Sequence, residues 1–205
     1  MENYQITEFC HHFVADHVKE GDFCIDATAG RGSDTVFLCS LVGDHGRGLA
    51  FDIQPEAVEA ASARIFESGC GHIASVIEES HEQLALYAEP DSVSCIMFNF
   101  GYLPGGDHSI ATTAETSIRA IEAGLSVLKK KGLMSLCIYS GGDTGYEERD
   151  ALLAFLQELD PKKYMVLLSR YYNRPNDPPI PAFILKLETF GGVPHLQHPL
   201  LLSYS

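Results

Sequence analysis

The chain has 205 residues, enough for one domain of ordinary size, so we expect a single domain over residues 1–205. Its formal net charge of −14 disfavours a protein that coats DNA or long RNA, because contacts of Lys and Arg with phosphates supply most of that affinity. The charge still allows an enzyme that meets one nucleotide through a local basic patch. No apolar run reaches the roughly 18 residues that span a bilayer, and the N-terminus lacks a basic and then apolar leader, so we expect a cytoplasmic protein without a membrane partner.

The six cysteines are scattered and form no C-x-x-C pair. Cys24, Cys95 and Cys137 lie in apolar runs, where a reduced thiol acts as a small hydrophobic side chain. We therefore expect neither a disulfide framework nor a zinc site, and no metal is assigned.

Apolar periodicity and turn residues predict helices and strands that alternate along most of the chain. In chain order, we expect a helix from residue 6 to about 18, a strand 23–28, a helix 33–42 capped near Ser33 or Asp34, a strand 47–53, a helix 55–69, strands 72–77 and 92–100, a helix from about 118 to the lysines at 129–131, a strand 132–140, a helix around 152–159, and strands 164–172 and 182–190.

This alternation predicts an α/β fold with a mostly parallel sheet covered on both faces. The last two strands have no helix between them, so they should form an antiparallel pair at one edge. Seven strands with that ending match the Rossmann-like sheet of class I methyltransferases better than a six-stranded dinucleotide fold.

The turn "DATAGRGSDT" (26–35) follows the first strand, at the edge where open α/β sheets bind ligands. Gly30 and Gly32 would let the backbone approach a ligand closely, although such glycines also occur in plain strand-to-helix turns. Asp52 closes the second strand 20 residues after Gly32, the spacing at which a carboxylate takes both hydroxyls of a ribose.

The residues that open the following helix favour a cationic cofactor over NAD. A dinucleotide fingerprint has a third glycine where this chain has Thr35, and Asp34 at the helix entry would repel a pyrophosphate. Asp34 suits the ammonium or sulfonium of S-adenosylmethionine instead, and Asp26 adds a second acidic group. The expected cofactor site of the turn comprises Asp26, Thr28, Gly30, Gly32, Asp34 and Thr35.

Three further residues are expected near the cofactor. Ser80 and His81 follow the third strand, where a loop usually lies beside the adenine, and Gln54 follows Asp52. His81 could equally cap a helix or face solvent.

The fourth strand ends in "NFGYLPGGDH" (99–108), which faces the place of a transferable methyl group. This segment resembles the N-P-P-Y motif of amino-methyltransferases without its prolines. Asn99 could orient a nitrogen lone pair and Tyr102 could stack on a base, while Asp107 and His108 are candidate proton acceptors. The alternative is a turn-rich loop with Tyr102 packed inward.

Together with "FDIQPEAV", "SHEQL" and "NRPNDPPIPAFILKLE", these motifs resemble the YtqB-like family over about residues 5–190. The resemblance implies a class I fold, S-adenosylmethionine as donor with S-adenosylhomocysteine as product, and N-methylation of 5-aminomethyl-2-thiouridine at position 34 of tRNA. It places Asn99, Tyr102, Asp107 and His108 toward the substrate, and Asp52, Gln54, Ser80 and His81 at the cofactor.

Two departures from the family pattern concern a cofactor contact at residue 31 and a tRNA contact in the C-terminal loop. Arg31 stands where family turns usually carry Asn, and "NRPNDPP" offers Arg174 where the family has paired asparagines. Arg170, Tyr172 and Arg174 still form a reasonable patch for the tRNA anticodon stem-loop, through charge and stacking. The lysines at 129–131 and 162–163 are expected to solvate a helix end and a turn.

Several alternatives stay open at this point. They are methylation of ribosomal RNA, methylation of a small metabolite, a cofactor-binding partner without turnover and, more distantly, a dehydrogenase. A homodimer is a further expectation, because acidic class I enzymes without an RNA-binding domain often assemble a composite surface.

Overall fold

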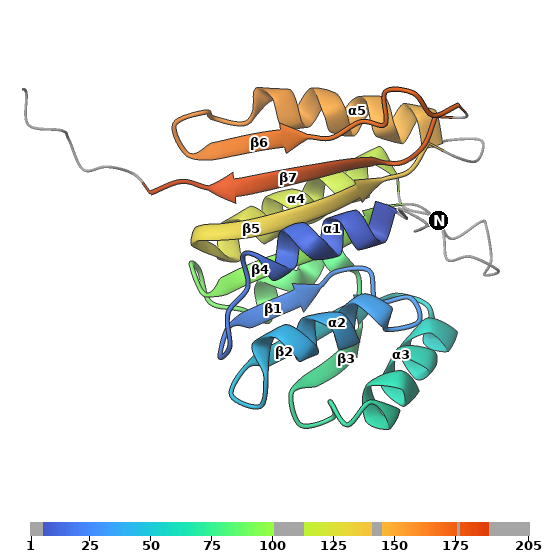
Figure 1. Cartoon of the computed structure of the whole chain (residues 1–205), viewed down its shortest axis with the longest axis vertical. Helices are drawn as coiled ribbons and strands as arrows, with labels where there is room; N and C mark the ends of the chain where they lie inside the picture. The colour runs from blue at the N-terminus through green and yellow to red at the C-terminus, as the bar shows by residue number, and fades with distance from the viewer. Residues whose placement is uncertain (1–5, 101–112, 141–144, 176, 189–205) are drawn as a thin grey trace, which may run out of the picture.

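The computed structural model describes residues 6–100, 113–140, 145–175 and 177–188, and it shows a sheet with helices on both faces (Figure 1). The seven strands have the order β3-β2-β1-β4-β5-β7-β6. Strands β1 to β5 run parallel, and β7 is antiparallel to both of its neighbours. The predicted α/β fold and its antiparallel edge pair are therefore confirmed.

The elements lie close to their predicted positions. In chain order they are α1 (Ile6–Ala15), β1 (Phe23–Asp26), α2 (Ser33–Val42), β2 (Arg47–Asp52), α3 (Pro55–Glu67), β3 (Ala74–Glu78), the 3-10 helix η1 (His81–Leu86), β4 (Val93–Phe100), α4 (Ala114–Val127), β5 (Leu128–Ile138), α5 (Gly145–Glu158), β6 (Tyr164–Leu168) and β7 (Ile180–Lys186).

Successive side chains of the central strands enter two separate cores, as strand geometry requires. Ile25 of β1 and Phe98 of β4 pack on the face covered by α4, α5 and η1. Cys24 and Met97, their neighbours along the chain, pack on the opposite face against α1 and α2. Both faces of the parallel strands are buried, which accounts for their nearly continuous apolar sequences.

The cysteines expected to behave as small hydrophobic side chains do so. Cys24, Cys95 and Cys137 are all buried. Burial raises the pKa of Cys24 to about 12, which keeps its thiol protonated.

The lysine run 129–131 differs from its prediction, since it begins β5 rather than solvating a helix end. Lys129 forms an ion pair with Asp22, with 2.7 Å between Nζ and Oδ1. Lys131 pairs with Glu188 at 3.0 Å. A register shift between β4 and β5 lies at this point, so the strand can begin directly after α4. Two of these lysines are thus engaged with carboxylates of the same chain.

Among the helices in the described part of the chain, none combines the length and the apolar character that crossing a bilayer requires.

The first turn of α2 packs closely against α3, and a glycine allows this. Gly32 is the N-cap residue of α2 and has a φ of 77°, in the left-handed region. A Cβ atom there would lie 2.9 Å from the Cα atom of Ala61. The predicted cap at Ser33 or Asp34 is therefore displaced by one or two residues, because only glycine combines this φ with this approach.

We expect Gly32→Ala to lower the free energy of unfolding by more than Gly69→Ala does. Gly69 has a similar φ of 75°, but a Cβ atom there would meet nothing within 4 Å. Gly69→Ala should therefore cost only the left-handed backbone penalty of about 1–2 kcal/mol. Gly32→Ala adds a backbone clash, for about 1–3 kcal/mol more. Urea unfolding of both variants measures the difference, and equal losses would contradict the close approach of α2 to α3.

Candidate functional site

Strand order reverses at β1, whose neighbours β2 and β4 leave in opposite directions across the sheet. The carboxyl ends of these strands meet at the edge where such folds bind ligands. Asp26 ends β1 and Asp52 ends β2. Asn99 is the last residue but one of β4. The backbone N–H of Asn99 donates to Thr28 Oγ1 at 2.8 Å, which ties the end of β4 to the turn after β1.

Asp26 is fully buried beneath the turn. Thr35 Oγ1 donates to its Oδ2 at 2.6 Å, and the backbone N–H of Thr28 donates to its Oδ1 at 3.2 Å. Burial, with the charge of Asp34 nearby, raises the pKa of Asp26 to about 7. Asp26 therefore acts as an internal support of the turn, held by the Thr35 hydroxyl and by the backbone of Thr28.

Asp34, in the first turn of α2, has a polar partner on each carboxylate oxygen. Its Oδ1 lies 2.7 Å from His11 Nε2, and its Oδ2 accepts a hydrogen bond from Asn99 Nδ2 at 2.7 Å. The side chain of Asp34 is only 11% exposed. The structure thus brings together the two predicted residues Asp34 and Asn99 and adds His11 of α1.

Asp52 supports the loops on either side of it and keeps acceptor capacity. The backbone N–H of Gly30 donates to its Oδ2 at 2.9 Å, and that of Gln54 donates to its Oδ1 at 3.0 Å. Each carboxylate oxygen has a second lone pair. Because Asp52 is only half-buried, these positions are open to a pair of ligand hydroxyls.

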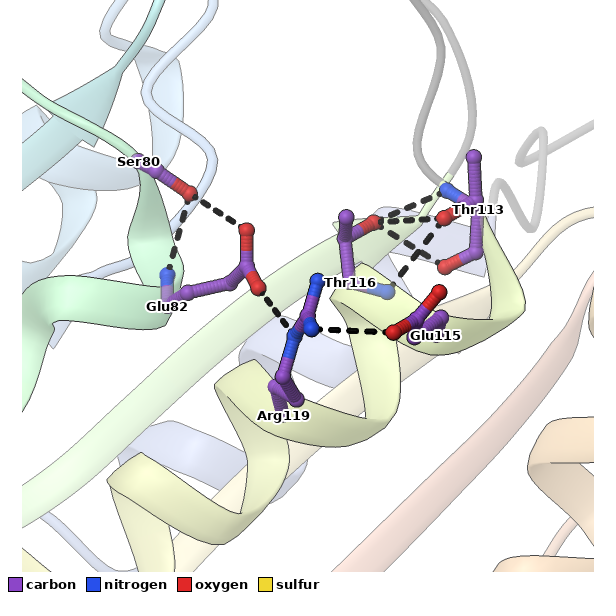
Figure 2. Close-up of polar contacts among 6 residues, drawn as sticks. All are labelled: Ser80, Glu82, Thr113, Glu115, Thr116 and Arg119. Carbon is purple, nitrogen blue, oxygen red and sulfur yellow. Dashed lines mark hydrogen bonds and ion pairs between the residues drawn. The ribbon is translucent and has the colours of Figure 1, made fainter.

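The loop that carries Ser80 and His81 is fixed by a polar network with α4 (Figure 2). Ser80 Oγ caps η1 by accepting from the backbone N–H of Glu82. The guanidinium of Arg119 bridges Glu82 and Glu115, and so joins η1 to the first turns of α4. Thr113 and Thr116 close a capping box where α4 begins.

His81 packs inward beside β4. Its ring meets Phe98 and Phe100 edge-on, with ring centroids 6.0 and 6.3 Å away. Burial lowers its pKa, although a hydrogen bond with the backbone of Ala27 acts in the other direction. Of the two alternatives for His81, capping is excluded, because Ser80 is the cap of η1. His81 is instead a half-buried ring beside the turn after β1.

Of the residues predicted to face the acceptor, the structure describes only Asn99. Tyr102, Asp107 and His108 lie outside the described residues. Tyr139, which follows β5 at the same edge, is 37% exposed, and burial of the rest of its side chain raises the pKa of its hydroxyl. It is a polar aromatic group near Asp34 that the sequence analysis did not single out.

The predicted substrate patch lies in the connection between β6 and β7. Ile138 at the end of β5 pairs with Ile180 at the start of β7, so this connection emerges at the same edge as the carboxyl end of β5 (Figure 1). Arg170 and Arg174 are exposed, and the Tyr172 side chain is completely so. The three side chains are accessible to a partner on this side of the sheet.

Two other residues near the edge escaped the sequence analysis. His11 sits beside the apolar face of α1, and no local pattern links it to Asp34. Ile53, between Asp52 and Gln54, is 54% exposed. Its exposure indicates a ligand contact, because a large apolar side chain is seldom left in solvent without a partner. In the sequence, the only signal was its place directly after Asp52. Arg31, which departs from the family pattern, points into solvent.

The sheet order, the left-handed glycines after β1 and the aspartate that closes β2 define the class I methyltransferase fold. A family model described as "Putative rRNA methylase" matches residues 49–185, more than half of the chain. The chain therefore belongs to this family of methyltransferases, as the resemblance of its motifs implied.

Individual relatives agree with this assignment. A protein of Arabidopsis thaliana described as "tRNA (mnm(5)s(2)U34)-methyltransferase, chloroplastic" is 32% identical over 192 residues, covering 89% of this chain and 69% of that protein. The crystal structure of a "putative rRNA-methylase" from Clostridium thermocellum matches with a TM-score of 0.87 and 38% identity, over 91% of this chain and 100% of the other. The "putative methyltransferase" SMU.1697c from Streptococcus mutans, crystallised in complex with SAH, matches with a TM-score of 0.80 and 30% identity, over 90% and 99% of the two chains.

We expect the stability of the protein relative to Asp26→Asn to fall as the pH rises from about 4 to about 8. The folded state binds the Asp26 proton more tightly than the unfolded state does, because the pKa of Asp26 is raised to about 7 on folding. This proton stabilises the folded state fully below the ordinary pKa of 3.8, and the stabilisation is lost as the pH rises through 7. The relative loss should reach at most about 4 kcal/mol.

Asn keeps an acceptor for the backbone N–H of Thr28, and its NH₂ group can donate to the hydroxyl oxygen of Thr35, so the variant should fold. Urea unfolding of both proteins at pH 5, 6, 7 and 8, without cofactor, gives the comparison. A constant difference across this range would contradict the raised pKa.

Proposed function

We propose that the protein transfers the methyl group of S-adenosylmethionine to the amine of 5-aminomethyl-2-thiouridine at the wobble position of tRNA. The product nucleoside would be the 5-methylaminomethyl form. The observation that carries this proposal is the amide of Asn99, which Asp34 holds at the edge where the turn after β1 and the end of β2 meet. The relative from Arabidopsis supports the nucleoside and the tRNA.

The residues at this edge fit S-adenosylmethionine. Asp52 offers one free lone pair on each oxygen to the two ribose hydroxyls. Asp34 and Asp52 place negative potential in this region, and their charges add to burial in raising the pKa of Asp26. Such a potential favours a ligand with an ammonium and a sulfonium over a diphosphate. Exposed Ile53, next to Asp52, is suited to cover a flat base.

Ser80, His81 and Gln54 border the same region and complete the proposed cofactor site. His81 carries little charge at neutral pH because burial lowers its pKa, so it would offer a hydrogen bond and a flat surface. Gly30, which is only half-buried, keeps the backbone of the turn accessible, whereas Gly32 is buried against α3.

Asn99 would position the acceptor amine. The cofactor supplies an electrophilic methyl group, so the protein mainly has to align a nitrogen lone pair with it and exclude water. The Asn99 Nδ2 group donates to Asp34, and no side chain among the described residues donates to its Oδ1, which can accept an N–H from the amine. An amine held in this way directs its lone pair toward the methyl group. The roles of Tyr102 in stacking and of Asp107 and His108 in taking the proton stay predictions.

Arg170, Tyr172 and Arg174 would contact the anticodon stem-loop. The two arginines can meet phosphates, and a fully exposed tyrosine can stack on an unpaired base. Two lysines of the 129–131 run form ion pairs within the chain, which makes that run a weaker candidate. The expected homodimer stays a prediction that the molar mass in solution decides.

We expect Asp52→Ala to weaken binding of S-adenosylhomocysteine about 10- to 100-fold, because the variant loses charge-assisted hydrogen bonds to the ribose. Titration calorimetry measures this change. Glu78→Ala is the matched control, because it removes the same charge at an exposed position. Glu78 lies beside Asp52 in the register of the neighbouring strand β3. An unchanged affinity in Asp52→Ala, or an equal loss in Glu78→Ala, would refute the ribose role.

We expect the protein to methylate tRNA that carries 5-aminomethyl-2-thiouridine, and Asn99→Ala to do so at least about 100-fold more slowly. The assay uses labelled S-adenosylmethionine, followed by digestion and nucleoside mass spectrometry. The same tRNA with an unmodified wobble uridine is the substrate control, because it lacks the acceptor amine.

Transfer to ribosomal RNA or to a metabolite extract, with the wobble nucleoside unchanged, would replace the proposed acceptor. Normal turnover by Asn99→Ala would exclude its amide as the orienting group.

A further inference from the structure

Three side chains from distant parts of the chain form one hydrogen-bonded series at the site. His11 of α1, Asp34 of α2 and Asn99 of β4 are joined by two contacts of 2.7 Å, from Nε2 to Oδ1 and from Oδ2 to Nδ2. The function proposed above uses Asp34 and Asn99 and leaves His11 without a role. His11 lies one step behind Asp34 and does not contact Asn99 itself.

We propose that His11 is a positioning residue, which holds Asp34 in the orientation that fixes the amide of Asn99. This inference rests on the proposed function for its catalytic consequence, although the orientation of the amide can be measured without any turnover.

The chemistry of the groups determines which end of the amide faces Asp34. The Asp34 oxygens accept hydrogen bonds here, so the NH₂ end of Asn99 must face Oδ2 and the carbonyl end must face away. The direction of Oδ1 on Asn99 thus depends on where Asp34 Oδ2 lies. A carboxylate with a single partner can rotate about its terminal torsion, which is broad, whereas a second partner on Oδ1 fixes the plane.

His11 is well placed to be that second partner. Its ring stacks on Phe37 of α2, with centroids 3.7 Å apart and planes at 7°. The stack fixes the ring plane and therefore the direction of Nε2. The helix that carries His11 is held in turn by Phe13, whose ring stacks on Phe183 of β7 at 4.0 Å.

The remaining titratable groups around Asp34 interact with its charge without a hydrogen bond to its carboxylate in the described part of the chain. Asp26, Cys10, Cys137 and Tyr139 all interact with the charge of Asp34 electrostatically. Asp26 takes its own donors from Thr28 and Thr35. A hydrogen bond with Cys10, together with burial, raises the pKa of Cys137, and burial raises that of Tyr139. In the described part of the chain, His11 and Asn99 are the side chains whose polar atoms are hydrogen-bonded to Asp34.

Two substitutions separate the hydrogen bond from the stack. His11→Phe keeps an aromatic ring on Phe37 and removes the donor to Asp34. His11→Gln keeps an N–H near the position of Nε2 and removes the ring. The donor, not the ring, should matter for the amide, so His11→Gln should resemble the wild type more closely than His11→Phe does.

The first measurement needs no activity. In nuclear magnetic resonance spectra, the side-chain amide of Asn99 is identified by its absence in Asn99→Ala. We expect its protons to exchange with water at least about 10-fold faster in His11→Phe than in the wild type, and at a nearly unchanged rate in His11→Gln. An amide that does not respond to His11→Phe would overturn the inference, whatever the acceptor of the methyl group is.

The second measurement tests the catalytic consequence with the tRNA assay. His11→Phe should lower kcat about 10- to 100-fold, with the affinity for S-adenosylhomocysteine changed less than about twofold. In the Asn99→Ala background the same substitution should have no further effect, because His11 acts through Asn99. A merely structural contribution would lower activity in both backgrounds and would overturn the inference, as would a loss of cofactor affinity in place of kcat.

The two failures are distinguishable. If wild-type protein leaves the wobble nucleoside unmethylated while the Asn99 amide still depends on His11, the proposed function fails and the positioning holds. If the wild type methylates the nucleoside and Asn99→Ala does not, while His11→Phe is normal, the positioning fails and the proposed function holds.

Discussion

Carboxylates at the edge of this sheet have to be supplied with hydrogen-bond donors, because a buried charge without partners costs several kcal/mol. Asp26 takes its donors from Thr28 and Thr35, within its own turn. Asp52 takes a donor from Gly30, which ties the end of β2 to that same turn. The hydrogen bonds that satisfy Asp26 and Asp52 therefore fix the position of the turn after β1. The position of the turn in turn determines where the candidate site lies.

The same arrangement concentrates negative charge at the place where the strand order reverses. Burial, with smaller contributions from the charges of Asp34 and Asp52, raises the pKa of Asp26 to about 7. Neutral Asp26 below pH 7 supports the turn, while Asp52 at the open edge keeps acceptors for a ligand. Buried Asp26 thus serves the fold, and half-buried Asp52 is left for the proposed binding role, although both end neighbouring parallel strands.

Sequence patterns predicted the parts of this site that depend on short-range geometry. The glycine turn after β1 and the spacing to Asp52 are local features, so both were predictable from the order of residues. The contact of Asp34 with Asn99 joins residues 65 positions apart, and that with His11 joins residues 23 apart. No periodicity encodes them, because they depend on which strands become neighbours. The cap of α2 at Gly32 was missed for a similar reason, since the approach of Ala61 decides it.

An acidic protein that acts on RNA, as proposed here, can attract phosphates only at local groups of unpaired basic side chains, because the rest of its surface repels them. Lys129, Lys131 and Lys186 form ion pairs with carboxylates of the same chain, which reduces their value as phosphate contacts. The net charge of −14 then works against any long-range attraction for a polyanion. Binding of the proposed tRNA substrate would therefore depend on a few contacts beside the site, in which the unpaired base and its amine weigh more than the phosphates. On that proposal the enzyme gains selectivity for the nucleoside and gives up affinity for RNA in general, which suits recognition of the acceptor amine by the amide of Asn99.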